Sequence, residues 1–289
     1  MRELASERGI VVTGSELVGL IPKAAMVNAG KFYLERMGES TGLPERMIME
    51  TAIQSMGLAE LTPFDLDKKV IEYAIAKKDR LSAMSLESFA DLLSTDTPAP
   101  GGGSVAAFCA ALSAALTAMV SNLTINKKGY ESVQYKVREI APQAQDIKLQ
   151  AIQLIDEDTD AFNAMMDASR LPKKTEEEIA LREQKIEEAT KQAILVPFHT
   201  LEIALQALKL ADEVAKVGNM NALSDAGTAA LTALTAAKAA NYNILINLPQ
   251  IKDEAFKEDI NNRAMNLLQE SETLASQIES FVSDRLKNA

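Results

Sequence analysis

Several acidic residues of the sequence could do proton chemistry, and Asp158 is the first of them. In the stretch LIDEDTDAFNAMMDASRLPKK, Asp158 and Phe162 are four residues apart and share one face of a predicted helix. A carboxylate turned toward an apolar wall has a raised pKa and can act as an acid or base near neutral pH. Acidic residues grouped in this way more commonly form a solvated helix face. Arg170 and Lys173, at the end of the helix, either complement its dipole or hold an acidic ligand tail.

Glycines that open a helix are the second feature. Gly101, Gly102, Gly103 and Ser104 lack the Gly-Lys-Ser/Thr ending of a nucleotide-binding P-loop and follow no strand. A glycine-rich loop before a helix leaves free backbone N–H groups that favour an anion or a polar ligand. The alternative is a tight turn with no ligand.

Polar residues within an alanine-rich segment are the third feature. Only Asp225 and Lys238 are charged between Asn221 and Leu248. The spacing i, i+4 places Asn221 with Asp225, and Asn243 with Asn247, on shared helix faces. Buried amides and carboxylates need partners, so these residues either tie helices together or bind a heteroaromatic ligand.

The small number of histidines and cysteines limits the metal and disulfide chemistry that the chain could support. His199 is the only histidine and Cys109 the only cysteine, so the sequence predicts no multi-histidine metal site, zinc cluster or intramolecular disulfide. His199 could act as a general base, although a histidine that packs between helices is the commoner case. No Ser-His-Asp arrangement or metal-ligand spacing is apparent.

Composition indicates a globular protein of the cytoplasm. The net charge of −11 argues against nucleic acid as the main partner. The single cysteine and the absence of an apolar leader in MRELASERGI predict a cytoplasmic location. No residue between Asp96 and Lys127 is charged, but small residues dominate this stretch, which favours a buried helix over a membrane span.

The elements that must position these residues are mainly helices. From about residue 81 onward the apolar spacing predicts an all-α bundle of long helices, near residues 104–123, 131–169, 175–217, 221–247 and 252–286. The first 76 residues mix signals: GIVVTG (residues 9–14) predicts a strand, and helices are predicted after Pro22 and between Pro44 and Gly57. We therefore expect a small α/β segment followed by a helical bundle.

Several motifs together resemble those of a known family. FADLLSTDTPAPGGGSVAA, DTDAFNAMMDASRLPK, NALSDAGTAAL and NYNILINL are similar in order and spacing to the formiminotetrahydrofolate cyclodeaminase family, over residues 82–289. VVTGSELVGLIP and FDLDKKVIEYAI resemble the end of the glutamate formiminotransferase domain, so residues 1–78 are interpreted as a remnant of that domain. Most of the transferase, including the half with the family's catalytic histidine, has no counterpart here, so we expect no transferase activity.

The resemblance implies a reaction without metal or organic cofactor, part of histidine degradation and one-carbon folate metabolism. In 5-formiminotetrahydrofolate, an amine attacks the formimino carbon, ammonia leaves, and 5,10-methenyltetrahydrofolate forms. Asp158 and Asp225 are the acid and base candidates. The implied substrate-binding residues are Gly101, Gly102, Gly103, Ser104, Phe162, Arg170, Lys173, Asn221, Ser224, Asn243 and Asn247.

Two other functions stay open at this point. Relatives of this fold hydrolyse the methenyl ring as methenyltetrahydrofolate cyclohydrolases, and a catalytically silent folate-binding or assembly protein is a further alternative.

The resemblance also implies partners: Arg170 and Lys173 would hold the glutamate tail of a folate that can be polyglutamylated. We expect a homodimer or a higher oligomer and no membrane partner.

Overall fold

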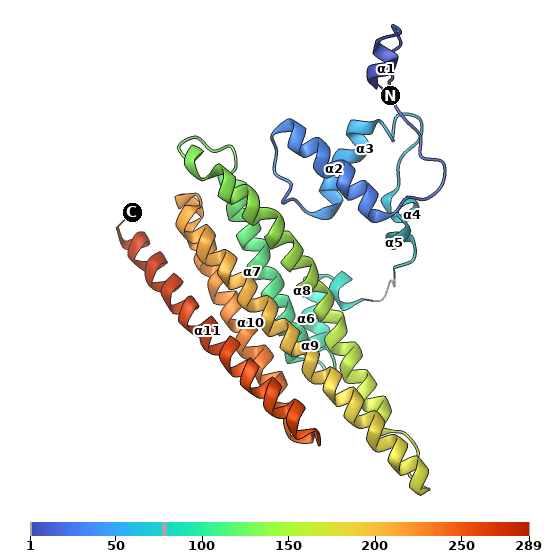
Figure 1. Ribbon diagram of the computed structural model, residues 1–289, viewed down its shortest axis with the longest axis vertical. Helices are drawn as coiled ribbons and strands as arrows, with labels where there is room; N and C mark the ends of the chain where they lie inside the picture. The colour runs from blue at the N-terminus through green and yellow to red at the C-terminus, as the bar shows by residue number, and fades with distance from the viewer. Residues whose placement is uncertain (1, 77–79, 289) are drawn as a thin grey trace. The chain divides into compact units, whose positions relative to one another are not determined.

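The computed structural model describes residues 2–76 and 80–288. The chain divides into two compact units, residues 1–78 and 79–289 (Figure 1).

Short helices build the first unit. They are α1 (Arg2–Ser6), α2 (Lys23–Met37), α3 (Glu45–Met56), α4 (Leu66–Lys69) and α5 (Ile71–Ala74). The predicted helices after Pro22 and Pro44 are confirmed: each proline caps its helix, and Gly38 and Gly57 end them in the left-handed conformation. The side chains that form the core are Met26, Met49, Ala52, Leu66 and Val70.

The strand predicted in GIVVTG is wrong. Residues 10–18 have no regular secondary structure, and Val11 is 83% exposed. Among the described residues of this unit, the only β pairing is an isolated parallel bridge between Ile21 and Val70. A β-branched run becomes a strand only beside a partner that satisfies its backbone groups, and these residues have none in the described unit.

The second unit is the predicted all-α bundle. Its helices are η1 (Leu81–Ala83), α6 (Leu86–Leu93), α7 (Gly102–Thr124), η2 (Glu131–Val133), α8 (Gln134–Ser169), α9 (Glu176–Val217), η3 (Met220–Ala222), α10 (Leu223–Asn247), η4 (Leu248–Gln250) and α11 (Glu254–Lys287). The five long helices match the predicted segments within a few residues. Local signals explain the boundaries: the Thr175 side chain caps α9 in a capping box with Glu178.

Helix α7 lies at the centre of this bundle. It packs against α8, α9 and α10, while α11 lies along α9 and α10 (Figure 1). Small residues, chiefly alanine and serine, occupy most of the buried face of α7, and Ala106, Ala107 and Ala110 are fully buried. Small side chains let the helix axes approach closely, so the uncharged stretch serves as an internal packing surface.

Among the described helices, α7 and α9 are long and apolar enough to cross a membrane. In each, 61% of the most apolar window is buried inside the bundle. Packing against neighbouring helices therefore accounts for their composition, as predicted for the stretch that contains α7.

Candidate active site

A cavity of about 310 Å³ lies where the first turn of α7 meets α8, α9 and the last turns of α10. Its lining residues come from the loop before α7, from the helices α7, α8, α9 and α10, and from η4. They are Pro98, Ala99, Gly101, Gly102, Gly103, Asp158, Phe162, Met165, Ala193, Asn243, Ile246, Asn247 and Gln250. The cavity thus gathers seven of the residues that the sequence analysis selected, from three separate motifs.

Asp158 is the one charged side chain among the described residues that line this cavity. The Ser104 hydroxyl donates a hydrogen bond to its Oδ2 over 2.9 Å, and the Ser104 backbone N–H donates to the same carboxylate. Burial raises the pKa of Asp158 above its ordinary value, and the two bonds from Ser104 oppose that shift. A carboxyl with a raised pKa can take up and release a proton near neutral pH.

Position 103 must be glycine, because the Asp158 carboxylate occupies the space that a side chain would need. A Cβ at Gly103 would lie 1.9 Å from Asp158 Oδ1, closer than any real contact, whereas a Cβ at Gly102 would lie 3.3 Å from Asn243 Nδ2. The glycine loop therefore brings the α7 backbone against α8 and α10. Side chains at these two positions would fill space next to the carboxylate and the amide.

The amides of Asn243 and Asn247 are held in fixed orientations. Asn243 Nδ2 donates to the Ala239 carbonyl over 2.8 Å, and Asn247 Nδ2 donates to the Asn243 carbonyl over 3.0 Å. Because each nitrogen is engaged by main chain, the orientation of each amide is set before any ligand binds. Together with the Phe162 ring, they give the cavity polar and flat apolar walls suited to a heteroaromatic ring.

The second acidic candidate lies elsewhere in the chain. Asp225 is in the first turn of α10, and Asn221 and Ser224 are beside it. Asn243 is 18 residues further along the helix, which corresponds to about 27 Å at 1.5 Å per residue. Within one chain, the structure does not bring these three residues to the cavity that holds Asp158.

The two basic candidates lie beyond the cavity. Arg170 caps the C-terminus of α8, is exposed, and forms an ion pair of 3.3 Å with Asp167. Lys173 is exposed in the following loop. Arg170 is 12 residues after Asp158, or about 18 Å along the helix direction. Neither side chain lines the cavity.

Some lining residues were missed by the sequence analysis. Met165 lies seven residues after Asp158, and Ile246 lies three residues after Asn243, so helical periodicity could have indicated both. Gln250 and the loop residues Pro98 and Ala99 carry no comparable signal, because turns have no fixed period.

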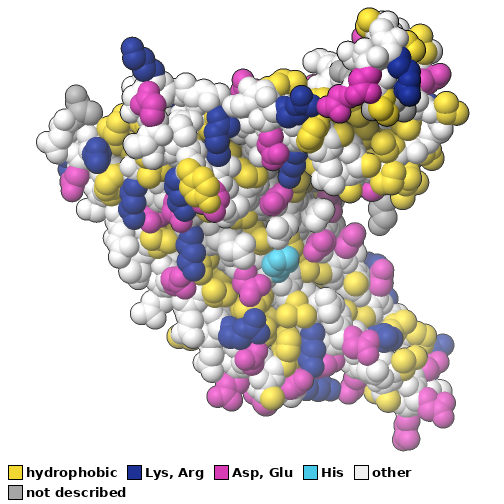
Figure 2. Space-filling model, turned by 45° about the horizontal axis from the view of Figure 1, so that its top comes forward, with side chains coloured by type: hydrophobic (Ala, Val, Ile, Leu, Met, Phe, Trp, Pro, Cys, Tyr) yellow, Lys and Arg dark blue, Asp and Glu magenta, His cyan; other side chains and the backbone are white. Residues whose placement is uncertain are grey.

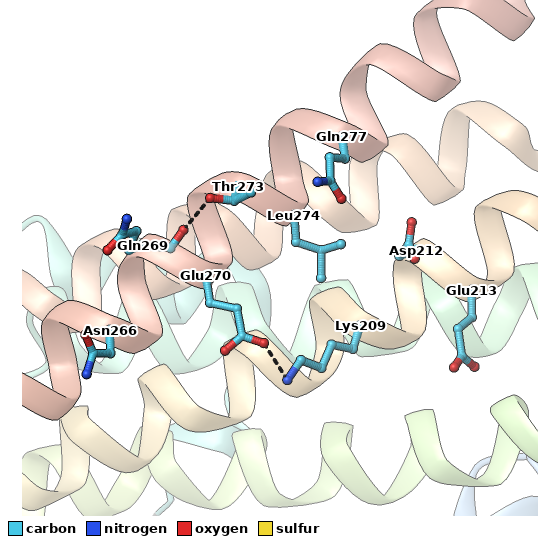
Figure 3. Close-up of a pocket in the computed structure, with 9 residues that line it drawn as sticks. All are labelled: Lys209, Asp212, Glu213, Asn266, Gln269, Glu270, Thr273, Leu274 and Gln277. Atoms are coloured by element: carbon cyan, nitrogen blue, oxygen red, sulfur yellow. Dashed lines mark hydrogen bonds and ion pairs between the residues drawn. The ribbon is translucent and has the colours of Figure 1, made fainter.

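A larger hollow of about 660 Å³ lies between α9 and α11, but it has different chemistry (Figure 3). Charged and amide side chains line it, and the Lys209–Glu270 ion pair of 2.7 Å reaches across it. It contains none of the residues from the sequence motifs. We therefore place the candidate site at the smaller cavity around Asp158.

His199 lies away from the candidate site. Its side chain is exposed on α9, in a shallow hollow with Glu157, Glu202 and Arg263, and Figure 2 shows it among acidic and basic side chains. It is not the helix-packing histidine that the sequence analysis considered the commoner case. It does not line the cavity that holds Asp158.

Two family models match the chain. The model described as formiminotransferase-cyclodeaminase matches residues 85–266, and the formiminotransferase domain model matches residues 1–76. The boundary between the matches falls in the same part of the chain as the boundary between the two compact units.

Individual relatives agree with these matches. Formimidoyltransferase-cyclodeaminase from Mus musculus is 36% identical over 278 residues, which cover 95% of this chain and 51% of the mouse protein. Methenyltetrahydrofolate cyclohydrolase from Methylorubrum extorquens is 37% identical over 202 residues, which cover 70% of this chain and 97% of that protein. The chain spans about half the length of the bifunctional relatives it matches.

A solved structure has a similar fold. The crystal structure of formiminotetrahydrofolate cyclodeaminase from Thermotoga maritima superposes with a TM-score of 0.62 at 28% identity, covering 72% of this chain and 98% of that one.

Proposed function

We propose that this chain, which belongs to the formiminotransferase-cyclodeaminase family, cyclises 5-formiminotetrahydrofolate to 5,10-methenyltetrahydrofolate and releases ammonia. The observation that carries the proposal is the Asp158 carboxylate, held by Ser104 in a cavity walled by glycines, amides and an aromatic ring. The same cavity provides what the reaction needs: a group that moves protons and a surface that orients two rings.

Asp158 would transfer the proton of the reaction. As the linker amine attacks the carbon of the protonated formimino group (–CH=NH2+), the carboxylate accepts the amine proton, and a five-membered ring closes. The resulting carboxylic acid then gives that proton to the –NH2 group formed by the attack, which leaves as ammonia, and the positive charge stays on the methenyl ring. A carboxyl with a raised pKa suits both steps. Holding the attacking amine against the carbon supplies much of the remaining rate, because the attack is intramolecular.

The other candidates would bind the substrate. Gly101, Gly102 and Gly103 allow close approach of the backbone, while Phe162 and the Asn243 and Asn247 amides contact the pterin ring. Arg170 and Lys173 extend past the cavity along the C-terminal end of α8. They would meet the glutamate tail, which is long, acidic and far from the reacting carbon.

We also propose that two copies associate through α7 and α10. Leu112, Met119 and Leu123 are exposed on one face of α7, at a spacing of seven and four residues, and no charged residue occurs anywhere in that helix. Tyr242 and Ile246 are exposed on the adjacent α10, and Ile246 also lines the cavity. An uncharged apolar face of this length is costly to leave in water, so a second copy is the proposed cover.

Association would give Asp225 a role that it lacks within one chain. If the α10 helices of two copies run antiparallel, the Asp225 end of one copy lies near the Asn243 end of the other. Asn221, Ser224 and Asp225 would then complete the cavity of the second copy. Asp225 would serve there as a second proton carrier or as an acceptor for the pterin edge.

The proposal includes three further expectations. The reaction needs neither a metal nor an organic cofactor, so dialysis against a chelator should leave turnover unchanged. The enzyme works in the cytoplasm. Residues 1–76 match the formiminotransferase domain model, and we expect no turnover of formiminoglutamate by the chain with this sequence.

The first test is an absorbance assay for the methenyl product, combined with ammonia measurement, on purified protein and 5-formiminotetrahydrofolate. Asp158→Asn keeps the shape of the side chain but cannot carry the proton, so kcat should fall about 10²-fold or more while substrate affinity stays close to that of the parent. Near-normal turnover of Asp158→Asn would remove Asp158 from the mechanism.

A cyclohydrolase is the second candidate function. The relative from Methylorubrum extorquens bears that name and aligns over 97% of its own length. Loss of added 5,10-methenyltetrahydrofolate without formation of product from the formimino substrate would favour the cyclohydrolase. Binding of both folates with no turnover of either would favour a silent folate-binding protein.

A further inference from the structure

We propose that Ser104 is a positioning residue for proton transfer, whose single hydroxyl supports Asp158 in both of its protonation states. The inference rests on the proposed function, because it assigns Asp158 the role of proton carrier. It adds a role for the buried hydroxyl beyond substrate contact.

The geometry places Ser104 Oγ between two acceptors of α8, with a third oxygen close by. Oγ is 2.9 Å from Asp158 Oδ2 and 3.1 Å from the carbonyl oxygen of Ile155, one turn earlier in α8, and the Thr159 hydroxyl oxygen lies 3.4 Å away. The Ser104 residue is fully buried, so no water competes for the hydroxyl. A serine has one hydrogen to donate and can accept as well, so it can satisfy only one of the two acceptors at a time.

Each protonation state of Asp158 then has its own arrangement. When Asp158 is ionised, the Ser104 hydroxyl donates to Oδ2. When Asp158 has taken up a proton, its O–H donates to Ser104 Oγ, and the serine hydrogen turns to the Ile155 carbonyl. A rotation about one bond keeps every polar atom satisfied before and after transfer, and buried polar atoms that lose their partners are costly.

Among the described residues, no other charged side chain at the cavity performs this task. Helix α7 has no charged residue, and the cavity-lining residues of α9 and α10 are Ala193, Asn243, Ile246 and Asn247. The lysines of those two helices that form described ion pairs are directed elsewhere: Lys185 pairs with Glu188, Lys191 with Asp253, Lys209 with Glu270, Lys216 with Asp212 and Lys238 with Glu272. On α8, Asp156 accepts from Ser82, and Glu157 lines the separate hollow with His199.

Ser104→Ala tests the role of the hydroxyl. It removes the hydroxyl that serves both protonation states but keeps the backbone N–H. Because the bond to the ionised carboxylate is charge-assisted and the stronger of the two, the ionised state loses more stabilisation and the pKa of Asp158 rises. The acidic limb of the kcat/KM profile should move to higher pH, and kcat should fall about tenfold with a smaller change in KM. The pKa of Asp158 in the substrate-free protein, from NMR titration of its side-chain carboxyl carbon, should rise in parallel. Ser104→Cys, a weaker donor of similar size, should fall between parent and alanine.

Ser113→Ala is the matched control. Ser113 is also fully buried in α7, but its hydroxyl has no hydrogen-bond partner and does not contact Asp158. It should change neither the pH profile nor the pKa of Asp158. If Ser104→Ala lowers activity only together with thermal stability, and leaves the profile and the pKa unmoved, the role of Ser104 is structural and the inference fails.

Failure of the inference can be told from failure of the proposed function. An inactive Asp158→Asn with an unshifted profile in Ser104→Ala overturns only the role of Ser104. An active Asp158→Asn overturns the proton carrier itself, whatever Ser104→Ala does. The NMR titration reports on the hydrogen bond in either case, because it needs no substrate.

Discussion

At the scale of single residues, the site depends on one contact between α7 and α8. Asp158 Oδ1 occupies the space where a side chain at position 103 would begin, and Ser104 holds the other oxygen. Two neighbouring residues thus fix the carboxylate, one by having no side chain and one by donating a hydrogen bond. No positive side chain lines the cavity in the described part of the chain, and burial is the main influence on the pKa of Asp158.

Gly103→Ala should therefore displace the carboxylate. Its methyl group would lie 1.9 Å from Asp158 Oδ1, so the side chain must move and the bond to Ser104 breaks. We expect kcat to fall at least about tenfold and thermal stability to fall as well, since overpacking a close contact costs about 1–3 kcal/mol. Gly101→Ala is the stability control, because nothing lies within 4 Å of its added methyl group. An unchanged melting temperature for Gly103→Ala would contradict the geometry.

At the scale of helices, close packing depends on alanine rather than on large apolar side chains. Fully buried alanines line α7 and α10, where the helix surfaces meet. This packing explains why α7 is as apolar as a membrane-spanning helix: most of its surface is buried against other helices of the bundle. It also leaves little room for larger residues at these positions.

Ala110→Leu should destabilise the bundle. Ala110 is fully buried, and three added carbon atoms must push neighbouring helices apart, at a cost of about 1–3 kcal/mol in the free energy of unfolding. The same substitution at Ala180, which is exposed in α9, should change that free energy by less than about 0.5 kcal/mol. Chemical denaturation of both variants gives the comparison. Equal stabilities would mean that α7 is not tightly packed.

The sequence predicted the helices better than the site. Helix α9 was expected at residues 175–217 and occurs at Glu176–Val217, because its capping signals are local. The strand in GIVVTG failed because a strand depends on a partner outside its own sequence. The bond between Ser104 and Asp158 joins residues 54 positions apart, so no spacing rule could indicate it. Asp225 was grouped with Asp158 by motif, although the length of α10 already separates it from Asn243.

At the scale of the whole molecule, the apolar face of α7 predicts self-association. Charges placed at Leu112 and Met119, as Leu112→Asp with Met119→Asp, should prevent two copies from covering this face, because burying unpaired carboxylates is unfavourable. Sedimentation equilibrium should show a monomer for this variant and a larger species for the parent. Gln277→Glu, which adds a charge at an exposed position on α11, should leave the assembly intact. A parent protein that sediments as a monomer would contradict the proposed interface.

The lone negative charge in the cavity also has a consequence for the order in which products leave. In the proposed reaction, Asp158 passes its proton to the departing nitrogen and is then an anion facing a methenyl ring system that carries a positive charge. Attraction between them is strong where water is scarce, whereas ammonia is neutral and feels little of it. Ammonia should therefore depart first and the folate second. Release of the folate should be faster in acid, when the carboxyl is neutralised, and slower in alkali.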